Sequence, residues 1–168
     1  FMVSMGGFDL HDFLPTQHPG LLTNVADALS SFYNATVELG VSNSVTAFTA
    51  SDFGRTLSSN GDGSDHGWGS HQIIVGGAVN GQRIYGDYPL LQIGSAMEIG
   101  GGRFIPGVSA DQYAATLASW LGVADADLAT IAPSIGNFAQ RDGGGILNYG
   151  WMTLTESTIS ANRAMSEG

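Results

Sequence analysis

Apolar residues near the start of the chain recur at spacings of three and four, the period of a helix with one apolar face. The positions that share this face are Leu22, Val25, Leu29 and Phe32. Pro19 is compatible with the first helical turn, because N–H groups there have no intrahelical acceptor, and Gly40 is compatible with the end of the helix. The pattern therefore predicts one amphipathic helix from about Pro19 to Gly40.

Two short segments on either side of this helix have the composition of buried strands. Residues 1–5 are apolar up to Gly6 and Gly7, and residues 45–50 are rich in β-branched side chains. Strand, helix and strand in this order predict a βαβ unit with parallel strands, and hence an α/β fold. The first segment has no charged leader before it, so we expect the chain to begin inside a larger domain.

The middle of the chain is rich in glycine, and its apolar residues show little periodicity. Residues 58–70 contain repeated glycines and small polar side chains, which predict a loop. Residues 72–75 resume as a strand, and residues 81–86 are expected to be the return arm of a hairpin. Residues 87–108 are predicted to be a loop with short extended pieces.

A second helix is predicted from about residue 110 to residue 121, where apolar residues again recur at helical spacing. Ser109 and Gln112 have the spacing of a capping box, in which each side chain binds the backbone N–H of the other residue. Residues 125–131 are expected to form a short third helix. Residues 151–168 have no periodic pattern and are predicted to be a tail.

The composition narrows the classes of partner. Acidic residues number 15 against five arginines and no lysine, for a net charge of -10. This charge repels nucleic acid and anionic lipid, so we expect neither as a partner. No stretch reaches the roughly 18 consecutive apolar residues of a membrane helix. The abundance of small polar residues without lysine is typical of an exported protein.

Acidic and imidazole side chains follow both predicted strands. Asp9 and His11 follow the first strand, on the same side of an extended segment, and Asp52 follows the second. Ligands of parallel sheets gather beyond the carboxyl ends of the strands. The glycine-rich loop adds the adjacent pair Asp65 and His66. With no cysteine in the chain, these residues predict a divalent-metal site, with zinc favoured and manganese, magnesium or calcium as alternatives.

Other interpretations of these residues stay open. Each of them is also compatible with an ordinary polar side chain on a surface loop. Oxygen-bearing side chains alternate from Asn60 to Asp65 as in a calcium loop, but Asp65 stands where that motif needs glycine and His71 where it needs glutamate. Arg55 has the chemistry to hold a phosphate or sulfate oxygen in a catalytic site. Its alternative is a structural ion pair with Asp52 or Asp65.

Three segments resemble, in order, the late motifs of the bacterial family called domain of unknown function 1501 (DUF1501). They are the segments 6–11, 51–56 and 60–71. The similarity continues through the helix at residues 109–117 and extends to about residue 150. Members of this family usually carry a twin-arginine export signal, so the resemblance implies a periplasmic or extracellular location.

By resemblance, the family also belongs to the alkaline phosphatase and sulfatase superfamily. This implies a three-layer sandwich around a mixed sheet, with residues 1–150 forming the carboxyl-terminal part of one domain. It also implies metal ions beside a nucleophile that lies in the amino-terminal half of the superfamily domain. Asp9 and His11 match the Asp and His that follow one strand in this superfamily. Two alternatives match its later Asp-His pair: Asp52, at the expected strand end, or the literal pair Asp65 and His66 in the loop. His71 is a candidate for the remaining imidazole ligand.

Two functions follow as hypotheses. The first is a metal-dependent hydrolase of phosphate or sulfate esters, in which metal ions neutralise the anion and polarise the scissile bond. Its partner is a small anionic ester. The second is a non-catalytic exported or surface-assembly module that keeps the fold, with a structural metal at most, and whose partners are other protein subunits.

Overall fold

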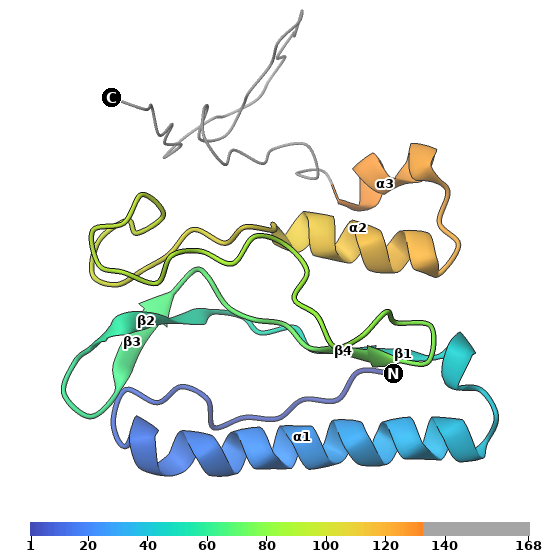
Figure 1. The fold of residues 1–168 in the computed structure, drawn as a ribbon, viewed down its shortest axis with the longest axis horizontal. Coiled ribbons are helices and arrows are strands. Elements are labelled where there is room, and N and C mark those ends of the chain that lie inside the picture. The colour runs from blue at the N-terminus through green and yellow to red at the C-terminus, as the bar shows by residue number, and fades with distance from the viewer. Residues whose placement is uncertain (133–168) are drawn as a thin grey trace, which may run out of the picture. The chain divides into compact units, whose positions relative to one another are not determined.

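The computed structural model describes residues 1–132. The chain divides into two compact units, and each is described by itself (Figure 1). The first unit contains Phe1–Tyr85 and Pro89–Pro106, and the second contains Gly86–Tyr88 and the described residues from Gly107 onward. The tail predicted at residues 151–168 lies outside the described residues, and the single domain over residues 1–150 stays a prediction.

The first helix, α1, spans Leu14–Glu38 and begins well before the predicted start at Pro19. A residue far away in the sequence explains this early start. The carboxylate of Asp62 accepts a hydrogen bond from the N–H of Phe13 at 3.1 Å, and its carbonyl oxygen accepts one from the N–H of Leu14 at 2.9 Å. These acceptors satisfy N–H groups that a helix start leaves without an intrahelical partner. Pro19 therefore lies inside the helix.

The end of α1 agrees with the sequence prediction. Gly40 has a φ of 72°, a left-handed conformation that glycine adopts without steric cost. Its N–H binds the carbonyl of Val37 at 3.0 Å, and the N–H of Val41 binds the carbonyl of Thr36 at 2.9 Å. These two bonds form a Schellman motif, which uses the last free carbonyl groups of the helix.

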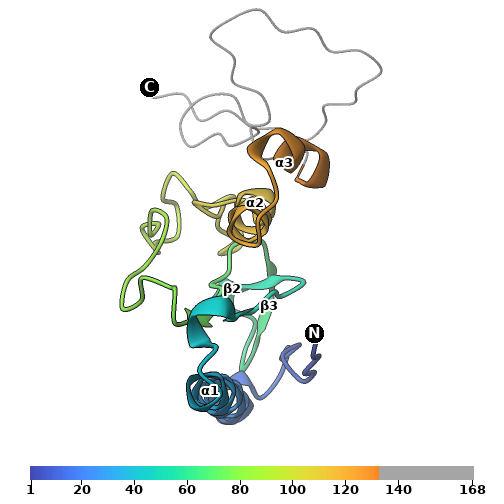
Figure 2. The same ribbon diagram turned by 90° about the vertical axis from the view of Figure 1, so that its right-hand side faces the viewer.

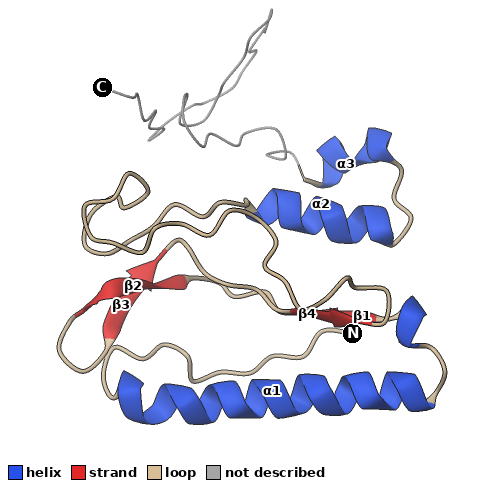
Figure 3. Ribbon diagram, in the orientation of Figure 1, coloured by secondary structure: helices blue, strands red, loops and turns tan. Residues whose placement is uncertain are grey.

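The strands form two small antiparallel pairs (Figure 3). β1, Thr46–Phe48, pairs with β4, Ile74–Gly76, with Ala47 opposite Val75. β2, Gly54–Ser59, pairs with β3, Ser64–Gly67. A short 3₁₀ turn, η1, Ser42–Ser44, joins α1 to β1. The fold of the described residues is therefore mixed α/β, with small antiparallel sheets.

Several strand predictions were wrong. Residues 1–5 form no strand, so the parallel βαβ unit is not present in the described chain. Residues 72–75 do contain a strand, β4, but its partner is β1 rather than residues 81–86. Residues 58–70 contain β3 and the end of β2, where a loop was predicted. Apart from Leu57, polar and glycine residues make up this hairpin, so apolar periodicity could not reveal it.

The segment before α1 runs beside that helix in both views (Figures 1 and 2). The backbone of Gly7 lies so close to Leu21 that a methyl group on Gly7 would stand 3.3 Å from the Leu21 side chain. Farther along, Leu10 is buried, and its carbonyl oxygen accepts a hydrogen bond from the N–H of Ser64 in β3 at 3.3 Å. The residues that follow Leu10 are thereby held beside the β2–β3 hairpin.

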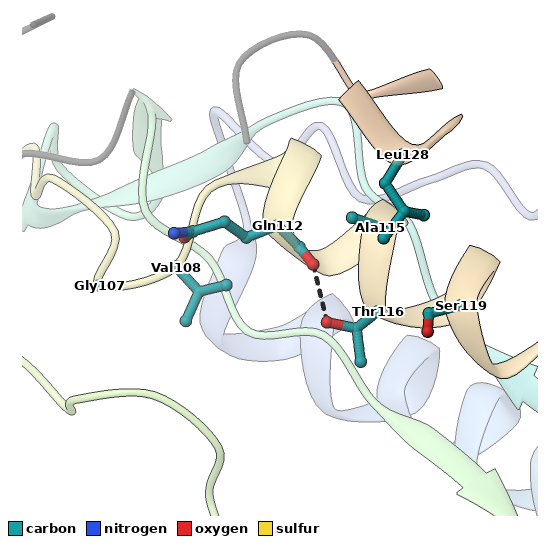
Figure 4. A pocket seen from close by; sticks show the side chains of 7 residues that line it. All are labelled: Gly107, Val108, Gln112, Ala115, Thr116, Ser119 and Leu128. Atoms are coloured by element: carbon teal, nitrogen blue, oxygen red, sulfur yellow. Dashed lines mark hydrogen bonds between the residues drawn. The ribbon is translucent and has the colours of Figure 1, made fainter. Parts of the chain in front are cut away.

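In the second unit, α2, Ala110–Trp120, and α3, Asp125–Ile131, confirm the predicted helices. The capping box is also confirmed, because Ser109 accepts from the Gln112 N–H at 3.1 Å and the Gln112 side chain accepts from the Ser109 N–H at 3.0 Å. An open hollow of about 570 Å³ lies between Val108, α2 and Leu128 of α3 (Figure 4). No charged side chain lines this hollow, so it is no candidate for the predicted metal chemistry.

Candidate metal centre

The carboxylate of Asp9 is the centre of a polar cluster at the β2–β3 hairpin. Its Oδ1 atom lies 2.8 Å from Nε2 of His66 and 3.0 Å from Nε2 of His11. The same atom accepts a hydrogen bond from Nη1 of Arg55 at 3.0 Å. Three cationic or potentially cationic groups thus converge on one oxygen atom, as expected for an anionic centre that holds its neighbours by charge.

The Nε2 atoms of the two histidines face each other. Nε2 of His11 and Nε2 of His66 are 3.2 Å apart, and the ring centroids are 5.0 Å apart. Two nitrogens at this distance cannot both carry a proton directed at the other. Where the two nitrogens bond to each other, one of them accepts through its lone pair, and a metal ion would need the lone pairs of both.

Arg55 is mostly shielded, with 19% of its side chain exposed. Its Nε donates to the Ser64 hydroxyl at 3.0 Å, and its Nη2 donates to the Ser64 carbonyl oxygen. With Nη1 bound to Asp9, each guanidinium nitrogen has a protein partner. The ion pair that the sequence left open is therefore made, but with Asp9 rather than with Asp52 or Asp65.

Asp65 lies on the far side of His11. Its Oδ1 is 3.3 Å from Nδ1 of His11 and accepts a hydrogen bond from the Asn60 side chain at 3.1 Å. The backbone N–H of Asp65 donates to the Thr56 hydroxyl at 3.1 Å, which ties this residue across the hairpin to β2. Asp65 therefore contacts the ring nitrogen of His11 that points away from Asp9.

His66 is held by an aromatic contact. The ring of Phe53 stacks on it with centroids 3.9 Å apart and planes at 13°, and the Arg55 guanidinium lies 5.8 Å from the Phe53 centroid. Stacking limits the rotation of an imidazole that is itself about half exposed, 48%. Phe53 was not predicted as a site residue. Its place next to Asp52 after a strand was the only sequence signal for it.

The structure brings some predicted ligands together and leaves others out. Among residues 1–132, Asp9, His11 and His66 form a group whose ligand atoms lie within 4.8 Å of one another. Asp65 is adjacent to this group through His11. Asp52 and His71 are exposed and do not belong to it. In the loop read as a calcium motif, the carboxylate of Asp62 instead binds the start of α1.

The separations within the group fit a small divalent cation. The three ligand atoms form a triangle with sides of 2.8, 3.0 and 3.2 Å. A cation with bonds of about 2.0–2.1 Å to nitrogen and oxygen needs ligand–ligand distances of about 2.9 Å in an octahedron and about 3.3 Å in a tetrahedron. The donor set, two imidazoles and one carboxylate, is also one that zinc uses in proteins.

The surroundings of Asp9 lower the pKa of its carboxyl group. The hydrogen bond from His66 is the largest cause, and the hydrogen bond from Arg55 and the charges of both histidines act in the same direction. Partial desolvation opposes them. Asp9 is 57% exposed, so water screens these interactions. The carboxylate form, which is the ligand form, is therefore the favoured form at neutral pH.

The described residues thus define a mixed α/β protein that carries an exposed Asp–His–His group at a polar hairpin. Residues 1–129 match the model of a family described as protein of unknown function (DUF1501). The match covers more than half of the chain, and the chain belongs to this family. Neither the curated proteins nor the solved structures contain a match to the chain. In residues 1–132, no helix is both long and apolar enough to cross a membrane.

Proposed function

We propose that Asp9, His11 and His66 bind one divalent cation, with zinc favoured, in a hydrolase-like domain for phosphate or sulfate esters. The observation that carries the proposal is the ligand triangle, whose sides of 2.8, 3.0 and 3.2 Å are close to the ligand–ligand distances around a small divalent cation. Bound there, the ion would supply Lewis-acid chemistry, which neutralises an ester anion and polarises its bond. About half of each ligand side chain is exposed, which leaves the ion accessible to a small anionic substrate.

The chain's own residues have distinct parts in this proposal. Asp9 supplies the anionic ligand, and the two Nε2 atoms supply neutral ones. Arg55 acts first as a positioning residue, because its Nη1 holds Asp9 while its other nitrogens hold Ser64. The role of Arg55 in binding a substrate anion remains a prediction, and it would require Nη1 to leave Asp9.

The wider setting of the site is also a proposal. The superfamily resemblance favours a three-layer alkaline phosphatase and sulfatase-like domain, whose amino-terminal half holds the nucleophile. The same resemblance, together with the acidic surface, favours export by the twin-arginine route to the periplasm or beyond. The partners are then a small anionic ester or other subunits, and the net charge of -10 disfavours nucleic acid.

Zinc titration of the purified chain tests the site. We expect one zinc ion per chain in calorimetry, and a loss of affinity of at least about tenfold in Asp9→Asn and in His66→Gln, because each removes a direct ligand. Asp52→Asn is the matched control, since it makes the same change of charge outside the group. The proposal is wrong if the chain binds no zinc, or if Asp52→Asn weakens binding as much as Asp9→Asn.

One observation favours the non-catalytic module as a second candidate. The Arg55–Asp9 pair, at 3.0 Å, offsets the charge of the carboxylate from within the protein, so a structural role of this pair needs no bound ion. Aryl phosphates and aryl sulfates separate the two candidates when they are assayed with a zinc-loaded protein that includes the amino-terminal half of the proposed superfamily domain. Turnover that disappears in Asp9→Asn supports the hydrolase. Zinc binding without turnover of either ester class supports the module.

A further inference from the structure

We infer that Asp65 is a positioning residue for the cation site: it fixes the tautomer and orientation of His11 so that Nε2 faces Asp9 and His66. This inference rests on the proposed cation site and deepens it. The sequence offered Asp65 as a ligand, but the structure turns its carboxylate toward Nδ1, the other nitrogen of the His11 ring, at 3.3 Å.

The argument begins with the two nitrogens of one imidazole. A neutral imidazole carries its proton on one ring nitrogen and a lone pair on the other. A carboxylate can only accept, so beside Nδ1 it favours the tautomer with the proton on Nδ1. In that tautomer the lone pair of His11 lies on Nε2, which is 3.0 Å from Asp9 and 3.2 Å from His66. Without a cation, the Asp9 carboxylate favours a proton on Nε2 by the same argument, so Asp65 and a bound cation would set this tautomer together.

Asp65 is itself held in place, which a positioning residue requires. The Asn60 side chain donates to the same Oδ1 at 3.1 Å, and the backbone N–H of Asp65 donates to Thr56 at 3.1 Å. Because Asn60 and Asp65 lie at the turn and on β3 of one hairpin, His66, the next residue along β3, is placed by the same segment. The hairpin thus supplies one ligand directly and orients another through Asp65.

The position of Asp65 relative to the ligand atoms separates this role from direct ligation. Among residues 1–132, the group whose ligand atoms lie within 4.8 Å of one another contains Asp9, His11 and His66 but not Asp65. Carboxylates that bind the far nitrogen of a metal-bound histidine are a common outer layer of metal sites, and their removal typically weakens metal binding by about 10–100-fold.

Two substitutions separate orientation from charge. Asp65→Ala removes the acceptor, and Asp65→Asn keeps an oxygen that can accept from both Nδ1 and Asn60 while removing the charge. We expect zinc affinity to fall about 10–100-fold in Asp65→Ala, with Asp65→Asn between it and the wild type. Far-ultraviolet circular dichroism of each variant confirms that it is folded.

The tautomer of His11 is the readout that a merely electrostatic or structural role would not move. In the zinc-free chain, at a pH where the ring is neutral, Asp9 competes for the proton at Nε2, so ¹⁵N NMR should show a larger share of the Nδ1-protonated form in the wild type and in Asp65→Asn than in Asp65→Ala. In Asp65→Ala the proton should move toward Nε2.

The inference is overturned if the His11 tautomer is the same in all three proteins, or if Asp65→Ala binds zinc as tightly as the wild type. It is also overturned if Asp65→Asn loses zinc binding as completely as Asp65→Ala, since that would make Asp65 a direct ligand. All three results presuppose that the wild-type chain binds zinc. Absence of zinc binding by the wild type would instead contradict the proposed function.

Discussion

Asp9 shows how one side chain can organise a site at the surface of a protein. Its Oδ1 atom has His66, His11 and Arg55 within 3.0 Å. The motif spacing identified Asp9, His11 and His66 as candidates, because carboxylate and imidazole side chains clustered around short strands. Spacing could not show that Asp52 and His71 would stand apart, since that depends on the paths of loops.

The protonation of Asp9 should leave a pH signature in the zinc-free protein. Because the folded state lowers the pKa of Asp9, its carboxylate contributes stability that is complete above the ordinary pKa of aspartate, about 3.9. This contribution is lost as the pH falls through the lowered pKa of the folded state. We expect Asp9→Asn to be less stable than the wild type at pH 6, with the difference shrinking below about pH 4.

Urea unfolding with a chelator present, repeated from pH 2 to pH 6, measures this difference. Asp52→Asn is again the control, because it makes the same change at an exposed aspartate outside the ligand group. A difference between Asp9→Asn and the wild type that stays constant over the whole range would contradict the assignment.

At the scale of elements, the short β2–β3 hairpin contacts both the start of α1 and the segment that carries Asp9 and His11. Its turn reaches both the start of α1, through Asp62, and the backbone of His11. A methyl group added to Gly63 would stand 2.0 Å from the His11 carbonyl oxygen, a distance no real contact allows. The absence of a side chain at Gly63 is thus what lets the hairpin approach the segment that carries Asp9 and His11.

Gly63→Ala should therefore destabilise the chain and weaken zinc binding together, because the hairpin must move away from His11. We expect a loss of roughly 1–3 kcal/mol, the usual cost of overpacking a close contact. Gly20→Ala is the matched control: Gly20 lies inside α1 with open space around it, so alanine should stabilise by about 0.5–1 kcal/mol. Chemical unfolding and zinc titration of both variants measure the two effects.

Zinc affinity that is unchanged in Gly63→Ala would show that the close approach does not shape the site. A loss of stability in Gly20→Ala would show instead that the surroundings of α1 are misassigned.

The elements also show where sequence reasoning succeeds. Helices were predictable because their determinants are local: the capping box before α2 and the glycine after α1 lie within a few residues of the ends they define. The early start of α1 could not be predicted, because its cap comes from the distant residue Asp62. The β2–β3 hairpin could not be predicted either, because nearly all of its residues are polar or glycine. Residues 1–5 were misread because apolar composition was taken as burial, whereas Phe1, Met2 and Val3 are almost fully exposed.

At the scale of the whole molecule, family membership and function are separate questions. The family match over residues 1–129 includes every residue of the proposed cation site. That family is described only as a protein of unknown function, so the match adds no chemistry. The chemical argument rests instead on three ligand atoms that converge from the segment before α1 and from β3.

X-ray absorption at the zinc edge, on the chain loaded with one equivalent of zinc, tests this convergence most directly. The account predicts a first shell of nitrogen and oxygen at about 2.0–2.1 Å, with the outer-shell scattering of two imidazoles. In His66→Gln, the imidazole contribution should fall by half. A first shell of oxygen alone, or an imidazole signal that is unchanged in His66→Gln, would contradict the account.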